Sequence, residues 1–145
     1  IIQDNITTNL FQIKESSIIG DKTIYDVFCK DNLAYLSCGF GIVVFDLSKK
    51  EVKDTYIIGS GGSQLKINTV FVSEGIIYAG TENGLYTANE SSAFLTDFNS
   101  WTKSTSIPNS NNEENQCLYL PASKLGVFLA NKDSIGHYSK ESKKI

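Results

Sequence analysis

A segment of 23 residues occurs twice in the chain without a gap, and this repeat limits the possible folds more than any other feature. The copies span 24–46 and 67–89 and lie 43 residues apart. Five positions are identical in the two copies: Ile24 and Ile67, Val27 and Val70, Phe28 and Phe71, Tyr35 and Tyr78, and Gly41 and Gly84. Four of the five are residue types favoured in strands, and the glycine permits a tight turn. The repeat therefore predicts a fold built from a recurring β unit.

Each copy contains three short strand-like segments separated by turn residues. We place them at 24–29, 33–38 and 42–46, and at 67–72, 76–80 and 85–88. A fourth strand follows each copy, at 55–58 and at 101–107, and we expect 49–54 to be a solvated turn. The only helix-compatible window, 91–98, is expected to form a single turn. Four strands in roughly 40 to 45 residues is the period of a β-propeller blade.

Weaker copies flank these two. A third begins near Cys117 and continues through 125–130 and 135–138, with Phe128 in the place of Tyr78. Residues 1–2 and 10–19 resemble the last two strands of a preceding blade. We therefore expect an all-β fold, a β-propeller fragment of four-stranded antiparallel blades in one partial domain. The expected extents are 1–145 for the domain, 24–62 and 67–108 for the two complete blades, and 1–20 and 116–145 for the two partial blades.

The length of the chain is short for a closed ring. Propellers typically close with about four to eight blades, which the 145 residues cannot supply. The chain also begins with Ile1–Asp4, which reads as the middle of a strand. Because unpaired sheet edges promote association, we expect a fragment of a longer chain or a homo-oligomer.

Charge and hydropathy limit the classes of partner. Sixteen acidic and thirteen basic side chains give a formal net charge of -3, which does not favour nucleic acid or an anionic membrane. No apolar run approaches the roughly 20 residues of a membrane span, and no signal-peptide pattern is present. We therefore expect no nucleic-acid partner and no membrane-spanning segment.

The residue combinations of common catalytic sites are missing from the sequence. His137 is the only histidine and lies in a strand-like segment, so a nucleophile would have no other histidine as its base. Cys38 precedes a turn, but no neighbour in sequence would lower the pKa of its thiol. Paired carboxylates of the kind that glycosidases use do not occur in matching loops. The sequence therefore predicts no enzyme and no catalytic residue.

Metal and cofactor motifs are also missing. The cysteines Cys29, Cys38 and Cys117 are too far apart for a metal site of CxxC type or a disulfide framework, and we expect them to be buried. Glu113 and Glu114, among asparagines, match no calcium loop, and the glycine-rich 59–63 is not followed by the Lys of a phosphate loop. We expect no metal and no cofactor.

Propeller geometry predicts where a binding site would lie. In a four-stranded meander, the turns between the second and third strands emerge on the same face as the connections between blades, and such loops often carry function. The candidate residues on this face are Phe40, Gln64, Glu82, Asn83, Asn111 and Glu113. Aromatic side chains could also stack on sugar rings, although strand positions favour core packing for most of them: Tyr25, Phe40, Tyr56, Tyr86 and Trp101.

Several stretches resemble the N-terminal propeller of the PorZ-like accessory proteins of the type IX secretion system of Bacteroidetes. They read AYLSCGFGIVVFDL at 34–47, DTYIIG at 54–59, IYAGTENGLY at 77–86 and DFNSW at 97–101. The resemblance covers about residues 1–108 and begins inside a blade of the family's propeller. The third stretch is also common to many other propellers.

The resemblance implies a non-catalytic binding propeller of an exported protein, in the periplasm or at the outer-membrane surface. Its partners would be proteins of a secretion and attachment complex, or a surface glycan such as lipopolysaccharide. Such propellers are also similar to the periplasmic, oligosaccharide-sensing repeats of hybrid two-component regulators, which gives the alternative function. A lyase or glycosidase built on a propeller is a third hypothesis, and the lack of paired carboxylates disfavours it. The matching residues are strand and turn residues, so the resemblance assigns no catalytic residue.

Overall fold

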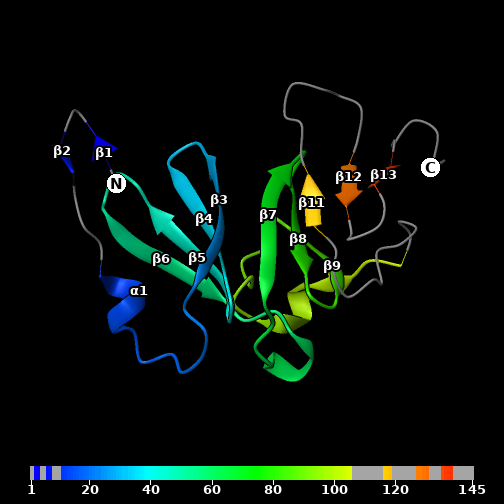
Figure 1. The fold of residues 1–145 in the computed structure, drawn as a ribbon, viewed down its shortest axis with the longest axis horizontal. Helices are drawn as coiled ribbons and strands as arrows, with labels where there is room; N and C mark the ends of the chain where they lie inside the picture. Colours follow the sequence, from blue (N-terminus) through cyan, green and yellow to red (C-terminus); the bar gives the residue numbers. More distant parts are fainter. Residues whose placement is uncertain are drawn as a thin grey trace.

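The computed structural model describes residues 11–105, and outside this range only the backbone of five short strands. Figure 1 shows two four-stranded antiparallel sheets side by side, with a small sheet at each end of the chain. In both four-stranded sheets each strand pairs with its neighbour in sequence, which makes each sheet a simple meander. The described structure is nearly all-β, and it confirms the prediction of a propeller fragment.

The first sheet contains β3 (Ile24–Lys30), β4 (Leu33–Cys38), β5 (Gly41–Asp46) and β6 (Glu51–Tyr56). The first three agree with the predicted strands, but β6 begins earlier than expected. The Asp46 Oδ1 atom accepts hydrogen bonds from the backbone N–H groups of Ser48 and Lys49, at 3.0 and 2.9 Å. This Asx-type turn reverses the chain within a few residues, so that Glu51 already pairs with Asp46. The expectation of a solvated turn over the whole of 49–54 was therefore wrong for 51–54.

The second sheet reproduces the first at the level of strand register. It contains β7 (Ile67–Ser73), β8 (Ile76–Thr81), β9 (Gly84–Asn89) and the short β10 (Thr102–Lys103). The register of the innermost pair shifts at Tyr25 in the first sheet and at the matching Asn68 in the second. Tyr35 pairs with Phe28, and Tyr78 pairs with Phe71. The two repeated tyrosines thus hold the same position in successive sheets.

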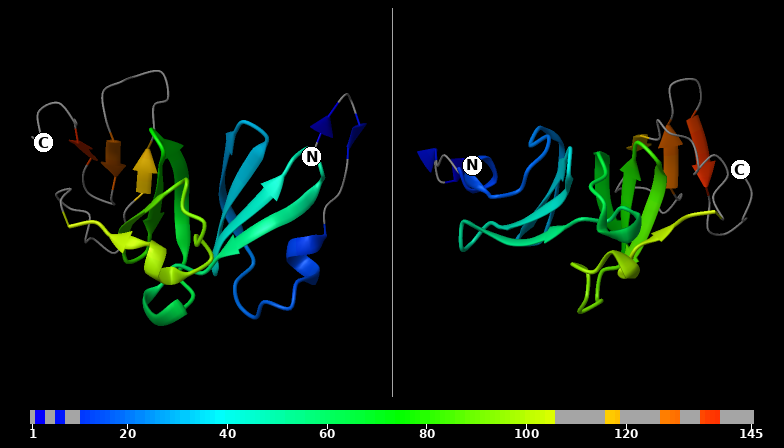
Figure 2. Two further views of the ribbon diagram at one scale, coloured as in Figure 1. Left: turned by 180° about the vertical axis from the view of Figure 1, so that it is seen from behind. Right: turned by 90° about the horizontal axis from the view of Figure 1, so that it is seen from below.

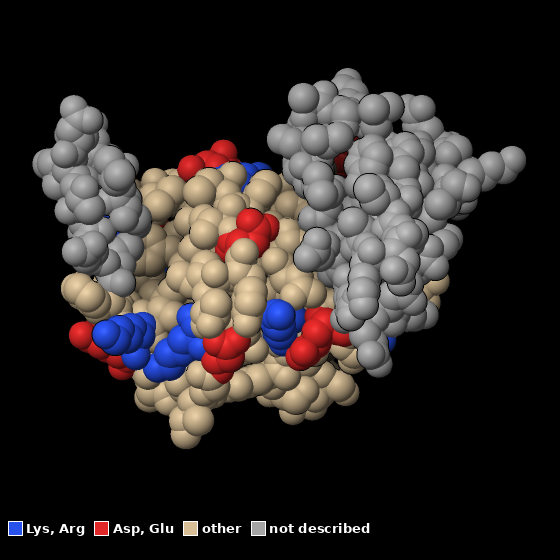
Figure 3. All heavy atoms as spheres, viewed as in Figure 1, with Lys and Arg blue, Asp and Glu red and all other residues tan. Residues whose placement is uncertain are grey.

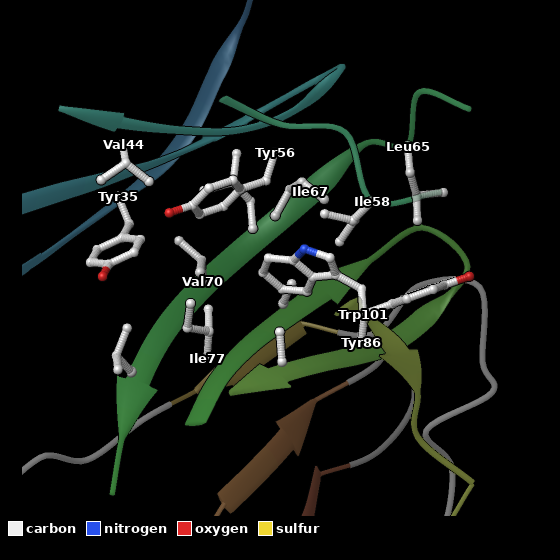
Figure 4. Packing of buried hydrophobic residues seen from close by; sticks show 14 residues of the cluster. Tyr35, Val44, Tyr56, Ile58, Leu65, Ile67, Val70, Ile77, Tyr86 and Trp101 are labelled. Atoms are coloured by element: carbon white, nitrogen blue, oxygen red, sulfur yellow. The ribbon is translucent and has the colours of Figure 1, made fainter. Parts of the chain in front are cut away.

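The two sheets bury a shared apolar core between them (Figure 4). Alternate residues of β4, β5 and β6 face alternate residues of β7, β8 and β9, which is the side-chain period of a strand. The core consists of Tyr35, Ile42, Val44, Tyr56, Ile58, Leu65, Ile67, Val70, Val72, Ile77, Ala79, Tyr86, Ala88 and Trp101. Fully burying one large apolar side chain contributes about 1.5–3 kcal/mol, so this interface is a main source of stability.

The N-terminal region differs from the prediction of two strands at 1–2 and 10–19. The backbone forms a short hairpin of β1 (Ile2–Gln3) and β2 (Ile6–Thr7), followed by one helical turn, α1 (Gln12–Glu15). The turn closes because the Glu15 N–H donates to the Phe11 carbonyl at 2.9 Å. It places Ile13 and Ile18 against a second apolar cluster on the outer side of the first sheet, formed by Cys38, Phe40 and Val43. Residues 11–19 thus cover the sheet without pairing with it as the expected strand.

A third sheet follows the second, with β11 (Gln116–Leu118), β12 (Val127–Ala130) and β13 (Ile135–Tyr138) close to the predicted strands. Phe128 pairs with Leu118, as Tyr78 pairs with Phe71. Strand β11 contacts β7 and β8, just as β7 contacts β3 and β4. The second and third sheets are therefore placed in the same way relative to the sheet that precedes each of them, as the two views of Figure 2 show. The extents of the single partial domain stay a prediction.

The outer side of β3 is less covered than the matching side of β7. Val27 is 52% exposed, whereas its repeat partner Val70 is 1% exposed because the first sheet packs on it. Cys29 on the same strand is exposed and Cys38 is buried, so the expectation of buried cysteines was wrong for Cys29. Both cysteines are free, and the structure does not describe the side chain of Cys117.

Candidate binding face

The predicted binding loops that the structure describes meet at one end of it. The Gly39 N–H, in the β4–β5 turn, donates to the Thr23 carbonyl at 3.2 Å, and the Glu82 N–H, in the β8–β9 turn, donates to the Lys66 carbonyl at 3.1 Å. Each bond ties a turn to the segment that enters the same sheet. The short helix η1 (Ser60–Gly62) in the connection between the sheets lies at this end too (Figure 1). We call this surface the end face; its described residues are Asp21, Tyr25, Gln64, Lys66, Glu82 and Asn83.

The repeated glycine is a backbone requirement of these turns. Gly41 and Gly84 follow two-residue turns and have φ angles of 156° and 105°, which L-residues with side chains rarely adopt. A Cβ atom on Gly41 would also collide with the backbone carbonyl oxygen of Tyr56. The identity of this position in both copies therefore reflects the geometry of the turn.

Phe40 does not belong to the end face, which corrects the sequence-based expectation. Its side chain is 0% exposed and packs with Cys38 and Val43 on the outer side of the first sheet. Ile13 and Ile18 cover it from the N-terminal segment. The side chain packs into this apolar cluster because burial there removes its surface from water, whereas a position on the exposed turn would leave it solvated.

The exposed turn residues Glu82 and Asn83 do lie on the end face. The Glu82 carboxylate accepts a hydrogen bond from the Lys66 N–H at 3.1 Å, and the Asn83 side-chain oxygen accepts one from Lys103 Nζ at 3.4 Å. The Asn83 N–H donates to Thr81 Oγ1 at 3.0 Å, which fixes the turn. Both residues are exposed, so their remaining hydrogen-bonding capacity faces solvent.

Gln64 also lies on the end face, where its side chain is tied to the chain before the first sheet. The Gln64 Nε2 group donates to the Ile19 carbonyl at 2.5 Å and leaves the side-chain oxygen near Gly20. The two other predicted candidates, Asn111 and Glu113, lie outside the described residues.

A cluster of Asp21, Tyr25 and Lys66 was missing from the sequence-based candidates for the end face. Tyr25 is 42% exposed, and its hydroxyl donates to Asp21 Oδ2 at 2.6 Å. Lys66 Nζ lies 4.3 Å from the centre of the Tyr25 ring, within the range of a cation–π contact. The core interpretation was wrong for Tyr25, although it is confirmed for Tyr56, Tyr86 and Trp101. The polar repeat partner of Tyr25, Asn68, was the available signal that this position is not a core position.

Asp21 gives the end face a dependence on pH. Hydrogen bonds from Thr23 and Tyr25 lower the pKa of its carboxyl to about 2, whereas an unfolded Asp has a pKa of about 3.9. Because the pKa of Asp21 is lower in the folded chain than in the unfolded chain, the carboxylate stabilises the fold at pH values above the unfolded pKa. This contribution is lost as the pH falls through the folded pKa. We expect Asp21→Asn to lower the free energy of unfolding at pH 7, and the deficit to vanish as pH falls from about 4 to about 2.

Urea unfolding at a series of pH values measures this effect. Glu51→Gln is a suitable control, because the exposed Glu51 side chain makes no hydrogen bond within the described residues and should show a small change. A deficit for Asp21→Asn that stays constant down to pH 2 would contradict the assignment.

The described part of the chain offers groups for noncovalent recognition. Burial raises the pKa of the Cys38 thiol to about 11, so it stays protonated and is a poor nucleophile at neutral pH. Residues 11–105 contain no group of three or more His, Cys, Asp and Glu side chains that could hold a metal ion. Nor do they contain a helix long and apolar enough to cross a membrane. Figure 3 shows acidic and basic side chains intermingled toward the end that carries η1, without a large patch of one sign on this view.

A family model described as "TSS9, PorZ, N-terminal beta-propeller domain" matches residues 1–102. The chain belongs to this family. The fold agrees, since the PorZ-type domain is similar to the solved structure of PorZ from Porphyromonas gingivalis, with a TM-score of 0.62 and 24% sequence identity over 88% of this chain. That protein is described as an essential bacterial surface component of the type IX secretion system.

A second solved structure shares the fold of the PorZ-type domain. It is the extracellular domain of a putative hybrid two-component system from B. thetaiotaomicron, with a TM-score of 0.58 and 19% identity over 83% of this chain. The present chain spans only 17% of the solved PorZ chain and 15% of the second one. No curated protein matches it.

Proposed function

We propose that this PorZ-type domain is a non-catalytic binding propeller of an exported protein that acts in type IX secretion and in surface attachment of cargo. The observation that carries the proposal is the family match over residues 1–102. The end face supports it, because Tyr25 at the start of β3, Lys66 just before β7 and Glu82 in the β8–β9 turn present an aromatic ring, an ammonium and a carboxylate.

The proposed location is the periplasm or the outer-membrane surface, and the proposed partners are proteins of the attachment complex or a surface glycan such as lipopolysaccharide. The description of solved PorZ as a surface component supports this location. Asp21, Lys66 and Glu82 give the end face charges of both signs, which suits a protein partner because complementary charges on it would favour the correct orientation.

Cargo attachment in the native bacterium tests the proposal. The parent protein would carry Tyr25→Ala together with Lys66→Ala, and surface and periplasmic cargo would be compared by immunoblot. We expect less cargo on the surface and more in the periplasm. The control is Lys49→Ala with Lys50→Ala in the β5–β6 turn, which lies at the other end of the strands. Unchanged cargo attachment after deletion of the whole gene would overturn the proposed function.

Oligosaccharide sensing is the alternative function, and the fold shared with the extracellular domain of a hybrid two-component system favours it. Under this alternative, deletion of the gene would abolish the transcriptional response to a particular oligosaccharide and leave cargo attachment intact. Measuring both outputs in the same deletion strain separates the two functions.

A further inference from the structure

A polar pocket of about 290 Å³ lies between the two four-stranded sheets. It opens beside the outermost strand β6 and under the β9–β10 connection, away from the residues of the end face. Its polar lining consists mainly of Tyr35, Lys53, Asp54, Tyr56, Glu90 and Ser92. Tyr56 was among the aromatic candidates for sugar stacking, but neither the repeat nor the candidates for the end face pointed to this pocket.

The wall formed by the β9–β10 connection is held by its own hydrogen bonds. Asn89 Oδ1 accepts from the Ser91 N–H at 2.9 Å, and Asp97 caps the short helix η2 (Phe98–Ser100). The Trp101 indole N–H donates to the Leu95 carbonyl at 2.9 Å and anchors the segment to the core. The first sheet has no matching wall, because its β5–β6 turn spans just four residues.

A register shift in β6 accounts for the charged side of the pocket. Asp54 pairs with Val44 and Val52 pairs with Phe45, so Lys53 is an extra residue in this strand. Such a bulge re-aims side chains, and both Lys53 and Asp54 line the pocket. An ammonium and a carboxylate therefore stand next to each other on one wall.

Two nearly buried tyrosines line the same pocket, and their hydroxyls have no protein partner within the described residues. Tyr35 and Tyr56 are only 3% and 5% exposed, and neither hydroxyl makes a hydrogen bond within the described residues. Ser37 Oγ is the one fully buried polar side-chain atom without a partner among the described residues, so the two tyrosine hydroxyls are open to the pocket and can bond a ligand or water. Burial raises the pKa of both groups, so both stay protonated and can donate as well as accept.

The rings of these tyrosines are not available for stacking. The Tyr35 ring packs on Phe28 with 6.4 Å between ring centres, and the Tyr56 ring packs on Trp101 at 5.8 Å. Figure 4 shows the Tyr56 hydroxyl on the side of Tyr35, away from the indole. A ligand would therefore be recognised through hydrogen bonds to the two hydroxyls.

The charges around the pocket balance. Lys30 Nζ contacts both carboxylate oxygens of Glu90 at 2.6 Å, and Lys53 stands beside Asp54. An anionic ligand would meet the carboxylates of Asp54 and Glu90, and a cationic one would meet the ammonium group of Lys53. A neutral ligand whose hydroxyls both donate and accept avoids both penalties.

We propose that this pocket binds a neutral polyol of monosaccharide size, held by the hydroxyls of Tyr35 and Tyr56 and by the carboxylate of Asp54. The site is separate from the end face, so the inference does not rest on the proposed secretion function. It assigns a ligand to the two pocket-facing hydroxyls, which make no hydrogen bond to the described part of the chain.

Titration of the 145-residue chain, followed by ¹H–¹⁵N NMR, tests the proposal. The probes are glucose, galactose and mannose, with ethylamine and acetate as charged comparisons. We expect saturable shifts of the Asp54 and Ser92 amides with at least one hexose and none with the charged probes. Tyr56→Phe and Tyr35→Phe should each weaken hexose binding roughly tenfold, the loss expected for one hydrogen bond in a site built for it.

Tyr86→Phe is the matched control, because Tyr86 is similarly buried but does not line the pocket. Circular dichroism would verify that all three variants keep the fold. Three results would each overturn the proposal: no saturable shift with any hexose, which would mean that water alone occupies the pocket; tighter binding of a charged probe; or hexose binding that both pocket variants leave unchanged.

Discussion

Replacing Trp101 with alanine should lower the free energy of unfolding by about 3–5 kcal/mol, the largest effect that we expect from a single substitution. Trp101 is 6% exposed and packs on Tyr56 across the interface between the two sheets. Its indole N–H also holds the β9–β10 connection through the Leu95 carbonyl. The substitution would leave a cavity and an unpaired carbonyl together. Urea unfolding followed by circular dichroism measures the loss.

Phe94→Ala in the same connection is the matched control. The Phe94 side chain is 70% exposed, so its removal should change stability by no more than about 0.5 kcal/mol. Equal losses for the two variants would show that Trp101 does not hold the two sheets together.

Gly41→Ala should destabilise the chain by about 3 kcal/mol, because the new Cβ atom would collide with the Tyr56 carbonyl and the backbone has φ of 156°. Tyr56 pairs with Ile42 at this point of the sheet, so relief of the collision would disturb the β5–β6 ladder. The loss is measured by thermal or urea unfolding.

Gly61→Ala is the control that measures the cost of a positive φ angle without a steric collision. Gly61 also has a positive φ, 66°, but a Cβ atom there would meet nothing within 4 Å. We expect a loss of only about 1 kcal/mol for this variant. A Gly41→Ala loss no larger than that of Gly61→Ala would contradict the close approach of Tyr56 to the turn.

The repeat predicted the first three strands of each sheet because its identical residues have structural roles in both copies. Tyr35 and Tyr78 occupy one position in the ladder, and Gly41 and Gly84 occupy one turn. Strand pairing depends on alternating burial and turn geometry, and both are visible in the order of residue types. The all-β propeller fragment could therefore be predicted from the sequence.

Elements outside the repeat were predicted less well, because local hydrogen bonds and burial determine them. The hydrogen bonds of Asp46 close the turn early, so that 51–54 pair with β5, although their polar sequence indicated a solvated turn. Residues 12–15 form a helical turn because Ile13 and Ile18 gain burial against Phe40. Such tertiary contacts override the weak preferences of short segments.

The candidate site was predicted in outline only. Backbone topology places the turns at one end, which the sequence indicated, but Phe40 turns inward and Tyr25 outward. The pocket at Tyr35 and Tyr56 could not be predicted, because it depends on a bulge in β6 and on how the long connection folds. Whether Gln64, Glu82 and Asn83 bind a partner stays a proposal.

The central claim is that 24–46 and 67–89 are the same structural unit in successive blades. An experimental structure of the chain tests it directly, by superposing β3, β4 and β5 on β7, β8 and β9. We predict that the Cα atoms of Tyr35 and Tyr78 coincide to well within one residue step. A displacement of about 3.3 Å along the strand, or of about 4.8 Å to a neighbouring strand, would contradict the account.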